Sequence, residues 1–199
     1  MIKNVIFDVG KVLVEWDTHM AFKKMGFDDE TEKAVADATV NSPDWEEFDR
    51  SVLSNDRQLD FFISKAPKYE REIRLFWENI GLPIYQYDYS MDWIKGLKES
   101  GYHVYILSNY SRWTYDNTQE ALSFLNYVDG QVFSFEVHQI KPEPEIYQSL
   151  LKKYNLNAEE CVFIDDRLVN VNAAKEQGIH TIQFTDYETA KSELQSLFA

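Results

Sequence analysis

The chain has 199 residues, of which 44% are hydrophobic and 15% aromatic, so it can bury the core of one domain that carries an insertion. Its formal net charge of −14 argues against nucleic acids and anionic membranes as main partners, because both attract basic patches. No stretch approaches the roughly 18 apolar residues of a membrane span. Cys161 is the only cysteine, which excludes an intramolecular disulfide and a thiolate metal cluster. With no leader pattern at its start, we expect a cytoplasmic protein.

The first predicted element is a short buried strand over residues 5–7, which is followed by Asp8 and Gly10. Residues 11–14 continue the apolar run, and residues 15–18 turn polar. A helix is expected near residues 19–25, where a following glycine would end it.

The next stretch, residues 28–88, shows no clear strand and is expected to be helical. Its apolar residues are spaced as in amphipathic helices. The predicted helices cover residues 31–41, 42–49, 56–65 and 69–79. Pro43 is suited to the first position of the second of these helices. We therefore predict a helical insertion over residues 15–87, with the core formed by residues 1–14 and 88–199.

Beyond the insertion, helical and strand patterns alternate. Strands are expected at residues 104–107, 131–135, 161–164 and 179–184, and helices at residues 90–100, 113–125, 144–154, 169–177 and 187–198. Alternation of this kind favours a parallel sheet with right-handed crossovers. The predicted fold is α/β, with a Rossmann-like five-stranded parallel sheet, helices on both faces, and the insertion after the first strand.

Polar side chains follow three of these strands. Asp8 comes after the first strand, Ser108 and Asn109 after the second, and Asp165 and Asp166 after the fourth. Because ligands bind at the carboxyl edge of a parallel sheet, we expect these five residues to converge in one crevice.

The expected crevice suits a metal ion and a phosphoryl group. Three neighbouring carboxylates repel one another unless a cation or protons compensate, and magnesium takes carboxylate and carbonyl oxygens as ligands. Gly10 would let its own carbonyl approach the cation. Lys141 supplies a fixed positive charge, and Ser108 and Asn109 supply neutral donors, as phosphoryl transfer requires.

Each of these residues also has an ordinary structural explanation. The two adjacent acids, Asp165 and Asp166, are typical of a surface turn or a helix cap. Lys141 precedes a proline and could be a solvated loop residue. Ser108 and Asn109 could form an ordinary polar turn.

Taken together, the motifs resemble those of the haloacid dehalogenase-like (HAD) hydrolase superfamily. Asp8 in FDVGKV, Ser108 in LSN, Lys141 in KPEPEIY, and Asp165 and Asp166 in FIDD match its four motifs in order and spacing. The helical insertion resembles the small cap of the type-I members. The most similar branch contains bacterial sugar-phosphate phosphatases and the N-terminal phosphatase domain of soluble epoxide hydrolases.

This resemblance implies roles for the motif residues. Asp8 would be the nucleophile that forms an aspartyl-phosphate. Magnesium would be held by Asp8, the Gly10 carbonyl and Asp166. Asp165 and Asn170 would orient these ligands and water.

The same resemblance implies which residues bind the substrate. Ser108 and Asn109 would hold phosphoryl oxygens, and Lys141 would bridge the phosphoryl group and Asp8. The cap would set specificity by covering the crevice. The candidate substrate contacts, each of which also suits a core or surface position, are Trp16, His19, Trp45 and Arg112.

One position departs from the family pattern. Phosphatases of this family usually carry a second aspartate two residues after the nucleophile, as general acid and base, and Gly10 stands there. Such a group contributes roughly 100- to 10,000-fold in rate. Glu15 or Asp17 could replace it, or the substrate could have a good leaving group, although both acids also suit solvated turn positions.

The leading hypothesis is a magnesium-dependent phosphatase for a small phosphorylated metabolite, for example a sugar phosphate. A phosphomutase fits less well, because Gly10 cannot return a proton to the substrate. A haloacid dehalogenase tolerates Gly10 but works without metal. A catalytically weak module that binds phosphorylated ligands also remains open, since a fold does not settle a function.

Overall fold

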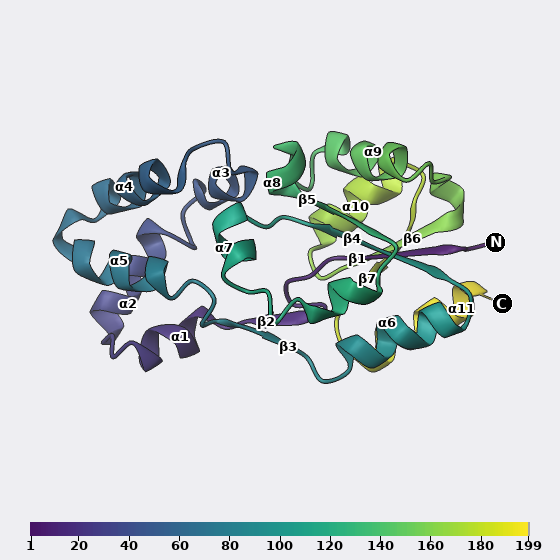
Figure 1. Cartoon of the computed structure of the whole chain (residues 1–199), viewed down its shortest axis with the longest axis horizontal. Coiled ribbons are helices and arrows are strands. Elements are labelled where there is room, and N and C mark those ends of the chain that lie inside the picture. Colours follow the sequence, from purple (N-terminus) through teal and green to yellow (C-terminus); the bar gives the residue numbers. More distant parts are fainter. Residues whose placement is uncertain (199) are drawn as a thin grey trace.

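A parallel sheet of five strands runs through one half of the molecule in the order β5-β4-β1-β6-β7 (Figure 1). The computed structural model describes residues 1–198. The strands are β1 (Asn4–Phe7), β4 (His103–Ser108), β5 (Gly130–Phe133), β6 (Cys161–Asp165) and β7 (His180–Gln183). All four strand pairings are parallel, and every residue of the central β1 is buried.

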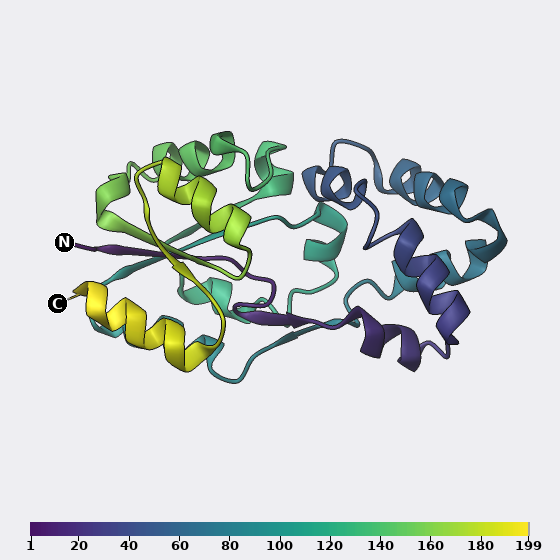
Figure 2. The same cartoon turned by 180° about the vertical axis from the view of Figure 1, so that it is seen from behind.

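Helices cover both faces of this sheet, as Figures 1 and 2 show. They are α6 (Ser90–Glu99) and α11 (Tyr187–Phe198) on one side, and α9 (Pro144–Lys153) and α10 (Leu168–Glu176) on the other. Because side chains alternate along a strand, β1 contributes side chains to two hydrophobic clusters, one on each face of the sheet. Phe7 packs edge-on against Trp93 at 4.7 Å between ring centroids, whereas Ile6 belongs to the opposite cluster with Tyr147. The predicted α/β fold is confirmed.

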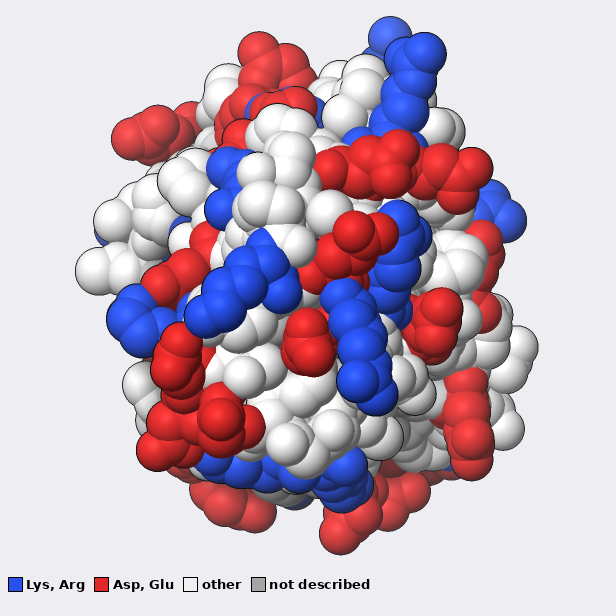
Figure 3. Space-filling model, turned by 90° about the vertical axis from the view of Figure 1, so that its left-hand side faces the viewer, with Lys and Arg blue, Asp and Glu red and all other residues white. Residues whose placement is uncertain are grey.

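A second body of helices lies at the other end of the molecule (Figure 1, left). Its helices are α1 (Thr18–Lys24), α2 (Asp29–Ala38), α3 (Trp45–Arg50), α4 (Asn55–Lys65) and α5 (Glu70–Glu78). They enclose their own aromatic core, in which Phe22, Phe62 and Phe76 are almost completely buried. Figure 3 views this end of the molecule, where acidic and basic side chains are interspersed. Ion pairs such as Lys23–Asp29 account for part of this pattern.

Two short strands join the helical body to the sheet. β2 (Val14–Trp16) pairs antiparallel with β3 (Ile84–Gln86), and Glu15 lies opposite Tyr85. The prediction that residues 28–88 contain no strand is therefore wrong at β3, which is too short to show a periodic pattern. The division into a core of residues 1–14 and 88–199 and a cap of residues 15–87 stays our proposal, which this pairing supports.

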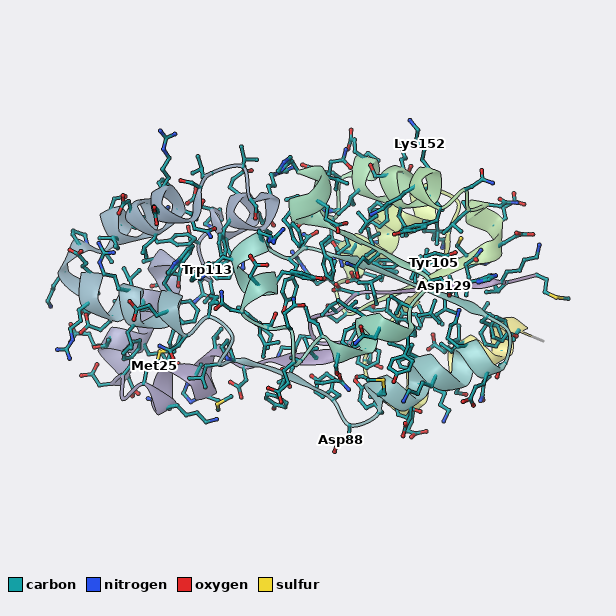
Figure 4. All side chains as sticks on the ribbon, in the orientation of Figure 1. Met25, Asp88, Tyr105, Trp113, Asp129 and Lys152 are labelled. Carbon is teal, nitrogen blue, oxygen red and sulfur yellow. The ribbon has the colours of Figure 1, made fainter. Side chains whose placement is uncertain are left out.

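The short helix α7 (Arg112–Asp116) also connects the two parts. Its Trp113, labelled in Figure 4, stacks on Trp77 of α5 at 5.5 Å, and its ring N–H donates to the Trp77 carbonyl at 3.0 Å. The predicted helix over residues 113–125 is wrong beyond Asp116. The Asn117 side chain donates to the Trp113 carbonyl at 2.8 Å and competes with continued helix.

Two smaller differences lie near the crevice. Helix α3 begins at Trp45 and not at Pro43, because residues 42–44 form a turn in which the Ser42 hydroxyl donates to Asp44 at 2.8 Å. Strand β5 ends at Phe133, before the short helix α8 (Ser134–Val137). Within residues 1–198, no helix has the length and apolar character needed to cross a membrane.

Candidate active site

Three adjacent strands deliver polar side chains to one edge of the sheet. Asp8 directly follows β1, while Ser108 and Asp165 are the last residues of β4 and β6. In register, Phe7 pairs with Ile106, two positions before Ser108, and with Ile164, one position before Asp165. The Ser108 hydroxyl donates to Asp8 Oδ1 at 2.7 Å, so the expected convergence is present.

Lys141 is buried between two of the carboxylates. Its Nζ lies 2.7 Å from Asp8 Oδ1 and 2.7 Å from Asp165 Oδ2, and only 1% of its surface is exposed. The solvated-loop explanation for Lys141 is therefore excluded. Burial acts against its charged form, but Asp165 and Asp8 outweigh it and raise the pKa of Lys141. The ammonium group is thus held charged at the centre of the site.

Asp8 has one occupied and one free oxygen. Within residues 1–198, all its hydrogen bonds reach Oδ1, from Lys141, Ser108 and the Val9 main-chain N–H at 2.7 Å. Oδ2 accepts no hydrogen bond from the described residues. Burial raises the pKa of Asp8 to about 7, with Lys141 opposing and Asp165 adding to the rise.

The two adjacent acids play different structural parts. Asp165 is fully buried, and its oxygens accept from Lys141, from the Arg167 N–H at 2.8 Å, and from the Asn170 amide at 3.0 and 3.1 Å. Asp166 is half-buried and lines the pocket. Asp166 is therefore the acid of this pair on the pocket wall, and Asn170 holds the carboxylate of Asp165.

The carboxylates meet the donor requirements of a hard divalent cation. Asp8, Asp165 and Asp166 each offer an oxygen, and these oxygens lie within 4.8 Å of one another. Oxygen donors of this kind are the ligands preferred by magnesium and calcium. Gly10 lines the same pocket, and its carbonyl accepts no main-chain hydrogen bond within residues 1–198. The residues present therefore fit a metal ion.

A pocket of about 620 Å³ lies between the sheet edge and the helical body. Its wall on the helical side includes Trp16 and Trp45, whose rings lie 5.9 Å apart. Two other predicted substrate contacts, His19 and Arg112, do not line it. His19 pairs with Glu32 at the surface, and Arg112 pairs with Asp116 of its own helix.

Two features of the site could not be read from motifs. The Asn109 side chain is engaged by the Lys141 main chain, at 2.7 and 2.9 Å, so it also holds the loop that carries Lys141. Asp49 of α3 lines the pocket although it belongs to the insertion. In the sequence it stands among other acids of an amphipathic helix, and only its contacts distinguish it.

Comparison with known proteins identifies the family of the chain. A family model described as haloacid dehalogenase-like hydrolase matches residues 2–178. The chain is 29% identical over 198 residues to D-ribitol-5-phosphate phosphatase from Bacteroides thetaiotaomicron, covering 92% of each protein. It is 27% identical over 199 residues to the sesquiterpene phosphatase astK from Aspergillus oryzae, covering 98% of this chain and 96% of that one.

A solved structure shares the fold. It is a HAD family enzyme from Bacteroides thetaiotaomicron in complex with magnesium and inorganic phosphate, with a TM-score of 0.72 and 25% identity. The match covers 95% of this chain and 98% of the solved one. From its motifs, its fold and a family match over most of its length, the chain belongs to the haloacid dehalogenase-like hydrolases.

Proposed function

We propose that the protein is a magnesium-dependent phosphatase that hydrolyses a small phosphorylated metabolite, for example a sugar phosphate, through an aspartyl-phosphate on Asp8. The observation that carries the proposal is the pairing of the pocket residue Asp8 with the buried Lys141 through Oδ1, which leaves Oδ2 without a hydrogen bond within residues 1–198. The two phosphatases among the relatives support the choice of reaction.

In this mechanism the residues position the substrate and neutralise its charge. Asp8 Oδ2 would attack phosphorus, while Lys141 would face both Asp8 and the phosphoryl oxygens. Ser108, which donates to Asp8 Oδ1, would keep the nucleophile in place. When bound by Asp8, the Gly10 carbonyl and Asp166, magnesium would supply positive charge to the phosphoryl group.

The volume of the pocket limits the size of the substrate. A volume of about 620 Å³ suits a small metabolite. The two tryptophans and the neighbouring polar side chains Asn41 and Ser42 offer both apolar and hydrogen-bonding contacts. We therefore propose a compact phosphate monoester as the substrate.

The first test is hydrolysis of p-nitrophenyl phosphate with magnesium, with EDTA, and with Asp8→Asn. This substrate has a good leaving group and does not depend on a general acid. We expect magnesium-dependent turnover that falls by at least about 10⁴-fold in Asp8→Asn. The exposed Asp60 provides the matched control, because Asp60→Asn should retain full activity.

The other outcomes separate the competing hypotheses. Magnesium binding by calorimetry that is lost in Asp166→Ala supports the proposed ligand set. A chain that binds no magnesium and cleaves no phosphate ester favours the dehalogenase. Phosphate binding without turnover of any phosphate ester favours the binding module.

A further inference from the structure

The proposed phosphatase reaction needs a proton donor for its leaving group, and Gly10 cannot supply one. Within residues 1–198, four carboxyl side chains line the pocket: Asp8, Glu46, Asp49 and Asp166. Asp8 is the proposed nucleophile and Asp166 a proposed metal ligand. The remaining two acids both belong to helix α3.

The two acids that the sequence offered as replacements are engaged elsewhere. The Glu15 carboxylate accepts from Lys11, from the Trp16 N–H at 2.8 Å and from the Tyr87 hydroxyl at 2.9 Å. Asp17 caps α1 by accepting from the Met20 N–H at 2.8 Å. Neither residue lines the pocket. The replacement must therefore be sought on the cap side of the pocket.

Hydrogen bonds at the end of α3 hold the segment that contains Asp49 against the core. Its carbonyl accepts from the Ser134 hydroxyl at 2.7 Å, and that hydroxyl also accepts from the Tyr110 N–H at 2.8 Å. The Ser51 hydroxyl accepts from the Arg112 N–H at 2.9 Å. These bonds fix α3 to the loops that follow β4 and β5.

The neighbouring Arg50 strengthens this attachment. Its guanidinium pairs with Glu143, at 2.9 Å between Nη1 and Oε2, and donates to the His138 carbonyl at 3.3 Å. Glu143 lies two residues after Lys141 in the same loop. The helix that carries Asp49 is therefore positioned by the segment that carries the catalytic lysine.

The surroundings of Asp49 favour its protonated form. Burial, Glu46 of the same helix, and Asp8 at the end of β1 raise the pKa of Asp49 to about 8. Lys141 and the main-chain N–H of Ser111 oppose the rise, and Tyr110 is the other titratable group that faces it. Glu46, in contrast, is exposed. At neutral pH, Asp49 can donate a proton and Glu46 is open to water.

We propose that Asp49 is the catalytic general acid and base of this enzyme, in place of the aspartate missing at position 10. The inference rests on the proposed phosphatase function. It assigns to a cap residue the proton transfer that other phosphatases of the family perform from the nucleophile's own loop.

The two half-reactions then balance. Asp8 Oδ2 bonds to phosphorus, the bond between phosphorus and the ester oxygen breaks, and that oxygen takes the proton of Asp49. The alcohol leaves, and Asp49 is now a carboxylate. A water oxygen then bonds to phosphorus while Asp49 takes a water proton. The bond to Asp8 breaks, which releases inorganic phosphate and restores both aspartates.

The test compares the first half-reaction on two substrates in the full-length protein with magnesium. p-Nitrophenyl phosphate has a leaving group that needs no proton, whereas an alkyl phosphate such as ribitol 5-phosphate needs one. Rapid-mixing experiments measure release of the first equivalent of alcohol or nitrophenol. The variants are Asp49→Asn and the matched control Glu47→Gln, which changes an exposed acid of the same helix that does not line the pocket.

We expect Asp49→Asn to release the first equivalent of nitrophenol at a rate within about tenfold of wild type, followed by a slow steady state. Release of the alkyl alcohol should fall by about 100- to 10,000-fold. Glu47→Gln should change neither rate by more than a few-fold.

Three results would overturn the proposal. Equal losses of both first-equivalent rates would make Asp49 a structural residue, and no loss on the alkyl substrate would remove it from proton transfer. An equal effect of Glu47→Gln would assign the loss to the charge of helix α3 in general. Absence of turnover by the wild-type protein on both substrates would instead contradict the proposed phosphatase function itself.

Discussion

The Asn109 side-chain amide forms two hydrogen bonds with the main chain of Lys141. Its Oδ1 accepts from the Lys141 N–H at 2.7 Å, and its Nδ2 donates to the Lys141 carbonyl at 2.9 Å. Both polar atoms of the amide are thereby engaged by one residue. Asn109 therefore acts on the site by fixing the segment from which the buried ammonium group reaches Asp8 and Asp165.

Replacing Asn109 should loosen this segment. Asn109→Ala is expected to lower the free energy of unfolding by about 2 kcal/mol, because two hydrogen bonds at about 1 kcal/mol each are lost. It should also lower kcat/KM by about tenfold or more, since Lys141 is less well placed. Urea unfolding and steady-state kinetics measure the two effects. The exposed Asn126 gives the control, and an Asn126→Ala variant with equal losses would contradict the positioning role.

Removal of the buried positive charge of Lys141 should destabilise the protein more strongly than Asn109→Ala. Lys141→Met leaves Asp8 and Asp165 buried without a counter-charge, which costs about 3–5 kcal/mol in EDTA near pH 7.5. The loss should shrink near pH 5, because uncompensated carboxyls take up protons in the folded state. Lys152 projects from α9 into solvent (Figure 4), and Lys152→Met should change stability by less than about 0.5 kcal/mol. A similar small change in Lys141→Met would show that the pair is not important for stability.

An acid introduced at position 10 should be tolerated. A Cβ atom at Gly10 would meet no atom within 4 Å, and the proposed metal contact uses only its carbonyl. Gly10→Asp is expected to melt within a few degrees of wild type and to bind magnesium. Combined with Asp49→Asn, it should raise alkyl phosphate turnover by about tenfold or more over Asp49→Asn alone. Gly10→Asn in the same background is the control, and loss of magnesium binding in Gly10→Asp would contradict the assigned carbonyl contact.

The acid assigned to proton transfer should reduce stability at neutral pH. The pKa of Asp49 is about 8 in the folded protein and 3.8 as its ordinary value, so the folded state binds the extra proton between these two values. Stability from this group is present below about pH 4 and decreases as the pH rises to about 8. Asp49→Asn removes this pH dependence and should melt at a higher temperature than wild type. The difference in melting temperature should increase as the pH rises from about 4 to about 8. Melting curves in EDTA near pH 5, 6.5 and 8 measure this difference, and a difference independent of pH would contradict the raised pKa.

The sequence could predict the sheet and the polar residues at its edge, because both depend on local patterns. Apolar runs alternating with helical patterns specify parallel strands, and the carboxyl ends of such strands share one edge. Asp8, Ser108 and Asp165 each stand directly at a strand end, so their convergence follows from the order of elements alone. The same reasoning could not find β3 or the end of α7. A three-residue strand carries no periodic signal, and the end of α7 depends on the Asn117 side chain.

By itself, then, the sequence determined the family, the sheet and the set of residues at its edge. The tertiary structure decided which atoms of these residues are free. It showed that Asn109 is engaged by Lys141, that Asp165 is surrounded by donors, and that Asp166 faces the pocket. It also placed Asp49 of the insertion on the wall of the pocket that Asp8 lines. Such pairings join residues that are far apart in the chain, and they depend on how the cap packs against the core. A local sequence pattern cannot predict that packing.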